Sequence, residues 1–124
     1  MTNKPKYNWQ IDYVFGLEEQ GDVINAHTHG MENYGHLDFQ IVIPFRLEHI
    51  YSLLNAMGER VRKGEVFKSG DVVSRLYQNV NIRLESFKES GRDVLRLIIP
   101  DQSGKFPEEE GCEYPYTLQT ETLF

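Results

Sequence analysis

The strongest constraint on the fold is a change in the spacing of apolar residues at Pro44. Before this proline, residues 39–43 form an almost continuous apolar run, which is typical of a buried β-strand. After it, apolar residues recur at intervals of three and four, which is the period of an amphipathic helix packed against a sheet. We therefore expect a strand that ends at Pro44 and a helix over residues 46–63, with Leu54 deeply buried. Gly64 suits the left-handed C′ position after this helix, and His49 on its polar side is expected to be solvated.

A hairpin is predicted in the second half of the chain. Residues 80–85 alternate between apolar and polar side chains, which indicates a half-buried strand. Residues 88–92 predict the turn and residues 93–99 the returning strand. Because the last residues of this returning strand are all apolar, we expect it to be central in the sheet.

Two further segments fit more than one structure. Residues 11–15 alternate like a short strand, and a helix through Glu19 is the alternative. The periodicity of residues 71–77 fits either a short helix or a strand. Trp9 is expected to plug an edge of the core, since tryptophan is highly buried on average.

Together these elements predict a single α+β domain over residues 1–124. Its sheet is mixed and mostly antiparallel, and the one main amphipathic helix packs on one face. A chain of 124 residues suits one hydrophobic core. The two ends, residues 1–10 and 120–124, are expected to be loosely ordered.

Charge, hydropathy and cysteine content exclude several classes of protein. The net charge is −6 and the basic residues are scattered, which opposes nucleic-acid binding. No apolar run approaches the roughly 20 residues that span a bilayer, so no membrane association is expected. Cys112 is the only cysteine, so a reducing cytoplasm is the simplest compartment. Its acidic sequence neighbours predict a raised thiol pKa and an unreactive thiol.

Three of the four histidines lie close together in the chain, and two of them share a strand face. On a strand over residues 23–29, alternate side chains point the same way, so His27 and His29 lie on one face with Asn25. Their Cβ atoms then stand roughly 6.5 to 7 Å apart, which allows both rings to turn toward one ion.

The following turn extends this set. If residues 38–43 pair with the histidine strand in antiparallel fashion, the chain returns His36 and Asp38 to the side of His29. His27, His29 and His36 are therefore the candidate ligands of a divalent metal such as zinc, because neutral imidazole is one of its common ligands. The alternative is a polar pocket in which the imidazoles bind neighbouring groups, since no H-E-x-x-H or C-x-x-C signature accompanies them.

Two carboxylates are candidates for a catalytic role beside such a site. Asp38 lies two residues after His36, and Asp101 lies in the tight turn over residues 100–104, at the end of the strand expected to be central. Each could orient or activate a metal-bound water. The alternative for Asp101 is a turn-stabilising residue that accepts hydrogen bonds from backbone amides.

The turn Pro100-Asp101-Gln102-Ser103-Gly104-Lys105-Phe106-Pro107, together with other short motifs, resembles the bacterial domain-of-unknown-function family 4262. The other motifs that carry this resemblance are Thr28-His29-Gly30-Met31, His36-Leu37-Asp38, Arg62-Lys63-Gly64-Glu65 and Gln119. The chain departs from the family pattern where Leu37 replaces a proline. It also departs where His27 and His29 replace an aromatic and an apolar residue. The resemblance implies a small α/β fold but does not indicate an activity, because none is established for the family. A metal site at these histidines would be special to this member.

Two functions fit these observations. The first is a small cytoplasmic ligand-binding or regulatory module whose His-rich polar site binds a small molecule or a protein. The second is a metal-dependent hydrolase built on His27, His29 and His36. The phosphate-binding motifs G-x-x-x-x-G-K-[ST] and G-x-G-x-x-G are absent, so no nucleotide cofactor is expected. Whether the chain forms a homodimer is left open.

Overall fold

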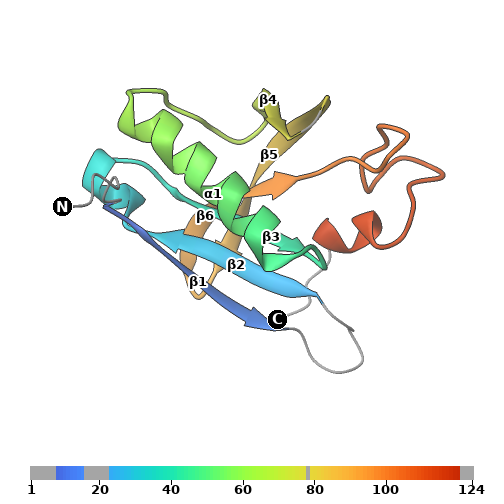
Figure 1. Cartoon of the computed structure of the whole chain (residues 1–124), viewed down its shortest axis with the longest axis horizontal. Coiled ribbons are helices and arrows are strands. Elements are labelled where there is room, and N and C mark those ends of the chain that lie inside the picture. The colour runs from blue at the N-terminus through green and yellow to red at the C-terminus, as the bar shows by residue number, and fades with distance from the viewer. Residues whose placement is uncertain (1–7, 16–22, 78, 121–124) are drawn as a thin grey trace.

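The strand before Pro44 and the helix after it form the centre of the molecule. The computed structural model describes residues 8–15, 23–77 and 79–120. Strand β3 (Asp38–Ile43) is buried along its whole length. Helix α1 (Leu47–Arg62) begins after the proline and lies across one face of the sheet (Figure 1). Leu54 is fully buried, and Gly64 has a positive φ of 106° after the helix. The strand, the helix and the C′ glycine predicted from the sequence are confirmed.

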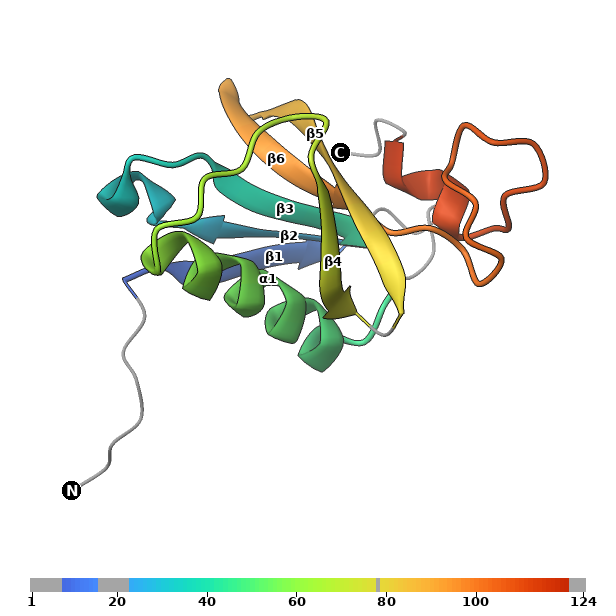
Figure 2. The same ribbon diagram turned by 90° about the horizontal axis from the view of Figure 1, so that it is seen from above.

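One six-stranded sheet contains all the strands among the described residues. The remaining strands are β1 (Gln10–Phe15), β2 (Ile24–His29), β4 (Val72–Tyr77), β5 (Val80–Glu89) and β6 (Arg92–Ile98). Their order is β1-β2-β3-β6-β5-β4, and only β3 and β6 are parallel neighbours. Figure 2 shows α1 running along one side of this sheet. The predicted α+β domain with a mixed, mostly antiparallel sheet is confirmed.

The predicted hairpin is present, with a tighter turn. Glu89 pairs with Arg92, so only Ser90 and Gly91 connect β5 to β6. Both have positive φ values, 51° and 82°, as a two-residue hairpin turn requires. Strand β6 lies between β3 and β5, which confirms its expected central position. The strands therefore extend further into residues 88–92 than the polar character of that segment suggested.

The two ambiguous segments are both edge strands. Residues 10–15 form β1 and residues 72–77 form β4, which is irregular where Arg75 takes a positive φ of 62°. Residues 11–15 therefore form a strand and not a helix, and the rest of the alternative helix, residues 16–19, lies outside the described part of the chain. The same holds for most of the ends that were expected to be loosely ordered, residues 1–7 and 121–124.

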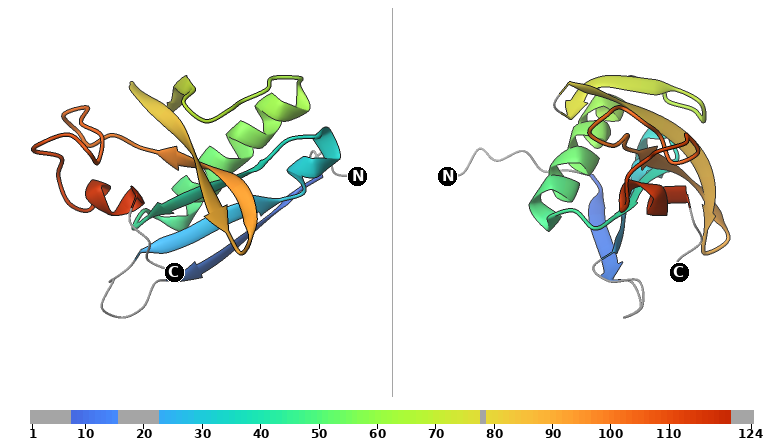
Figure 3. Two further views of the ribbon diagram at one scale, coloured as in Figure 1. Left: turned by 180° about the vertical axis from the view of Figure 1, so that it is seen from behind. Right: turned by 90° about the vertical axis from the view of Figure 1, so that its right-hand side faces the viewer.

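The core lies between α1 and the inner face of the sheet. Trp9 closes one edge of it and is 7% exposed, and its Nε1 donates a hydrogen bond to Asn55 Oδ1 at 2.9 Å. Trp9 therefore plugs the edge of the core, as predicted. The chain after β6 forms turns and the short helix η3 (Tyr116–Thr120), at the end of the molecule away from η2 (Met31–Tyr34) (Figure 3). Within the described residues, no helix is long and apolar enough to cross a membrane.

Candidate metal site

The outer face of the sheet, opposite α1, carries the histidines of β2. Ala26 and Thr28 are fully buried, whereas His27 and His29 are only partly buried. Strand β1 adds a third side chain to this face, because Asp12 pairs directly with His27 in the antiparallel register. Strands β2 and β3 are antiparallel neighbours as predicted. The alternation of β2 therefore gathers its two imidazoles beside a carboxylate from the neighbouring strand.

Three ligand atoms converge in this cluster. His27 Nε2 lies 3.0 Å from His29 Nε2, and His29 Nε2 lies 3.0 Å from Asp12 Oδ2. All three atoms are within 4.8 Å of one another. Two nitrogens that bind one tetrahedral zinc ion at about 2.0–2.1 Å are about 3.3 Å apart. The separation in the structure is therefore close to the separation that such an ion needs.

Hydrogen bonding alone cannot account for both short contacts of His29 Nε2. A ring nitrogen of imidazole has one in-plane position, which holds either a proton or a lone pair. His29 Nε2 faces both His27 Nε2 and Asp12 Oδ2 at 3.0 Å, and it can make one directed hydrogen bond. A cation at the centre would instead accept lone pairs from both rings and from the carboxylate.

The electrostatic environment favours the ligand form of His27. Burial lowers the pKa of its imidazole below 6.5, and the nearby His29 and Arg92 lower that pKa further. His27 is therefore neutral at neutral pH, which is the form that binds a metal. Its Nδ1 is buried and has no hydrogen-bond partner among the described residues. The side chains of His29 and Asp12 are 41% and 50% exposed, so an ion can reach the cluster from solvent.

The structure does not bring His36 to this cluster. Its Nδ1 bonds to the carbonyl oxygen of Leu37, and its Nε2 accepts a hydrogen bond from the backbone N–H of Phe67, both at 2.9 Å. The ring also packs against Phe39, with centroids 5.3 Å apart, and Phe39 belongs to the core on the side of α1. The loop after β2 thus carries His36 toward the opposite face of the sheet.

Asp38 has a structural position rather than a free carboxylate. Its Oδ1 accepts hydrogen bonds from Thr28 Oγ1 at 2.9 Å and from the backbone N–H of Met31 at 3.0 Å. Its Oδ2 forms an ion pair with Arg92. Both oxygens are therefore engaged, and the carboxylate fixes the turn between β2 and β3.

Asp101 lies at the far end of the sheet from the histidines. It follows the carboxyl end of β6, which is parallel to β3, whereas His29 lies beside the amino end of β3. The topology therefore does not bring Asp101 beside these histidines. Its carboxylate accepts hydrogen bonds from the backbone N–H groups of Ser103, Lys105 and Glu113. The bonds from Lys105 and Glu113 lower the pKa of Asp101 most, as the turn-stabilising alternative predicts.

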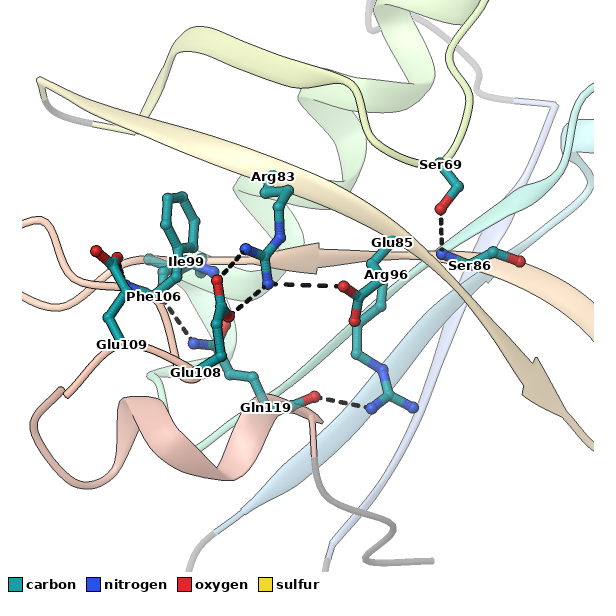
Figure 4. Close-up of polar contacts among 10 residues, drawn as sticks. All are labelled: Ser69, Arg83, Glu85, Ser86, Arg96, Ile99, Phe106, Glu108, Glu109 and Gln119. Atoms are coloured by element: carbon teal, nitrogen blue, oxygen red, sulfur yellow. Dashed lines mark hydrogen bonds and ion pairs between the residues drawn. The ribbon is translucent and has the colours of Figure 1, made fainter.

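A buried polar strip continues from the cluster across the same face. Gln40 donates through Nε2 to Asn25 Oδ1 at 2.9 Å and to Glu89 Oε2 at 2.7 Å, and it accepts from Arg96 Nε at 2.7 Å. Arg96 is 6% exposed and stacks on Phe87. It also donates a hydrogen bond to the backbone oxygen of Gln119 (Figure 4). Burial lowers the pKa of Arg96 to about 10, so it stays charged at neutral pH.

The Gln119 side chain also has a clear structural position. The side-chain amide of Gln119 both accepts a hydrogen bond from the N–H of Ile99, at 2.7 Å, and donates one to the carbonyl oxygen of Ile99, at 2.6 Å.

Burial raises the pKa of the Cys112 thiol, and the carboxylates of Asp101 and Glu109 raise it further. The predicted direction of the thiol pKa is confirmed, with burial as the main cause. The low reactivity of the thiol stays a prediction.

Sequence reasoning missed Asp12 and the polar strip. The signal for Asp12 was its place in an alternating segment just before the histidine strand, which would form an antiparallel hairpin with it. Pairing of those two segments fixes which residue faces His27, and the sequence alone did not show that they pair. The polar strip needed the registers of four strands, which no short motif carries.

Comparison with known proteins identifies the family. No curated protein and no solved structure matched the chain. The family model described as Domain of unknown function (DUF4262) matches residues 5–113, which include Asp12, His27 and His29 as well as the turn at Asp101. This chain therefore belongs to the family Domain of unknown function (DUF4262).

Proposed function

We propose that this domain is a divalent-metal-binding module in which Asp12, His27 and His29 are the ligands. The observation that carries the proposal is the convergence of their three ligand atoms, with His29 Nε2 at 3.0 Å from both neighbours. Two imidazoles and one carboxylate suit zinc and similar transition metals better than calcium or magnesium, which prefer all-oxygen sites. Zinc is therefore the first candidate.

The proposed ligands lie on rigid elements, which favours binding over an incidental surface cluster. All three come from the paired strands β1 and β2 rather than from loops. The register Asp12↔His27 places the carboxylate beside the rings without any rearrangement of the backbone. The proposal replaces His36 with Asp12 in the ligand set.

Zinc binding to protein purified without a His tag tests the proposal. Calorimetry should show one zinc per chain, and the melting temperature should rise, because ligand at 100 times Kd stabilises the folded state by about 2.7 kcal/mol. Asp12→Ala, His27→Ala and His29→Ala should each abolish the rise. His49→Ala, on the exposed side of α1, is the matched control and should leave it unchanged. The affinity should fall as the pH drops through about 6.5, because protonated imidazole does not bind metal.

His36→Ala distinguishes the ligand set of the structure from the set expected from the sequence. Because the His36 ring bonds to the backbone of Phe67, its loss should lower stability and leave zinc affinity unchanged. Absence of any thermal shift with zinc, nickel or manganese in the wild-type protein would contradict the proposal.

A metal-dependent hydrolase is the second candidate, and one observation favours it. Three protein ligands leave at least one position of a four-coordinate zinc for water or substrate, as in catalytic zinc sites. A divalent ion there would lower the pKa of a bound water. A groove of about 380 Å³ borders His29 and could hold a substrate. Zinc-dependent hydrolysis of a chromogenic ester, lost in His27→Ala, would favour this candidate over a binding module.

The cellular setting also stays a proposal. We infer a cytoplasmic location, because a chain with a single cysteine forms no internal disulfide and so suits a reducing compartment. The expected lack of nucleic-acid binding follows from the net charge of −6. A small-molecule or protein partner stays a prediction. Size-exclusion chromatography with light scattering can decide whether the chain forms a homodimer.

A further inference from the structure

The groove beside His29 has a defined position relative to the proposed metal ligands. It lies between the amino end of β1 and the short helix η2, and its volume is about 380 Å³. Among its lining residues are Asn8, Gln10, His29, Gly30, Glu32 and Asn33. His29 belongs both to the groove and to the cluster of ligand atoms. A molecule in the groove is therefore next to any ion that His29 holds.

The two walls of the groove are tied together. Asn33 Nδ2 donates to the carbonyl oxygen of Asn8 at 2.9 Å, and Asn8 Nδ2 donates to the Tyr34 hydroxyl at 3.0 Å. Gly30 has a φ of 122°, and a Cβ at this position would lie 2.5 Å from the carbonyl oxygen of Asn8. Only glycine allows the backbones to approach this closely. The groove is therefore formed before a ligand arrives, as binding sites usually are.

The chemistry of the lining predicts the kind of ligand. The groove residues include the side-chain amides of Asn8, Gln10 and Asn33, one carboxylate, Glu32, and no lysine or arginine. Once Asp12, His27 and His29 hold a divalent ion, the carboxylates of Asp12 and Glu32 balance its two positive charges, so the groove offers no net positive charge to an anion such as phosphate or acetate. The carboxylate of Glu32 accepts a hydrogen bond from an N–H donor. The lining therefore suits an uncharged molecule that carries an N–H group.

We propose that this groove binds a small uncharged carboxamide whose carbonyl oxygen completes the coordination of the ion held by Asp12, His27 and His29. Its N–H group then faces Glu32. This inference rests on the proposed metal-binding function and adds the class of ligand and the residue that selects it. A carboxamide offers an acceptor to the metal and a donor to the carboxylate, which is the pattern that the groove presents.

Binding of acetamide to the zinc-loaded protein tests this inference. The variant Glu32→Trp fills the groove from an exposed position of η2, and Glu110→Trp makes the same change at an exposed position in the segment after β6. Zinc affinity should be equal in the wild-type protein and both variants. Nuclear magnetic resonance titration should show that Glu32→Trp weakens acetamide binding at least about tenfold, whereas Glu110→Trp leaves its affinity unchanged. Acetate should bind the wild-type protein more weakly than acetamide and should gain affinity in Glu32→Gln.

The outcomes separate this inference from the function on which it rests. Equal binding of acetamide to Glu32→Trp and Glu110→Trp, with zinc bound to both, would overturn the assignment of the groove. Acetate binding that is unaffected by Glu32→Gln would overturn the selection against anions. Failure of the wild-type protein to bind zinc would instead refute the metal site itself.

Discussion

Replacing Gly58 with alanine sets two physical effects against each other at the point where Trp9 crosses α1. In the interior of a helix, glycine is less favourable than alanine by about 0.8–1.0 kcal/mol, so the exchange should stabilise an exposed helix. Gly58 is a buried residue of α1, however, and the indole ring of Trp9 lies directly against it. The sign of the effect therefore depends on the packing.

The structure gives the size of the steric conflict. A Cβ on residue 58 would lie 2.5 Å from Cζ2, 2.6 Å from Cε2 and 2.9 Å from Cη2 of Trp9. Carbon atoms in contact normally stand about 3.5–4.0 Å apart, so the ring would have to move by about 1 Å. Trp9 is held by its hydrogen bond to Asn55 at 2.9 Å. Overpacking costs about 1–3 kcal/mol, so the net destabilisation after the gain in helix propensity should be about 0–2 kcal/mol.

Urea denaturation followed by far-ultraviolet circular dichroism measures this effect in a double-mutant cycle. The second variant, Trp9→Phe, removes the part of the ring that would meet the new Cβ. In the Trp9→Phe background, Gly58→Ala should be neutral or stabilising by up to about 1 kcal/mol. The gain in helix propensity cancels in the cycle, so the coupling free energy between the two positions should equal the cost of overpacking, about 1–3 kcal/mol.

One result would refute this reasoning. If Gly58→Ala stabilises the wild-type protein by about 1 kcal/mol, and the change is the same with Phe at position 9, the ring does not pack on Gly58. The variant also bears on the candidate site, because Trp9 directly precedes β1, which carries Asp12. A displaced β1 should weaken zinc binding together with stability.

Three further predictions concern other parts of the fold. Leu54→Ala, at a fully buried position, should cost about 2–5 kcal/mol in urea unfolding, and a cost below about 0.5 kcal/mol would show that the helix stripe is not core. Asp101→Asn should lower stability at neutral pH, because the pKa of the Asp101 carboxyl is depressed in the folded state. The ionised carboxylate therefore stabilises the fold above its unfolded-state pKa, and this stabilisation is lost as the pH falls through the folded-state pKa. Unfolding at pH 7 and near pH 2 should therefore show a difference from wild type that shrinks in acid, and a constant difference would contradict the role of the charge. Cys112 should react with a thiol reagent at neutral pH more slowly than a free model thiol, because its pKa is raised, and faster labelling would overturn this.

Local patterns determined much of the fold. The change of apolar period at Pro44 predicted both β3 and α1, because a buried strand and an amphipathic helix have different repeats along the chain. The polar, glycine-containing segment 88–92 predicted the turn of the β5–β6 hairpin. In the structure, Ser90 and Gly91 adopt the positive φ values that such a turn needs. The alternation of residues 71–77 was too weak to decide, and pairing with β5 makes that segment a strand.

The candidate site divides in the same way. The sequence by itself determined that His27 and His29 share one face of β2, because alternation along a strand is a local property. Only the tertiary structure decided that Asp12 joins them, since that depends on the register between β1 and β2. It also decided that His36 does not join them, since the backbone of Phe67 binds its ring from a segment 31 residues away. Contacts between distant segments arise from the packing of the whole chain, and no short sequence pattern contains them.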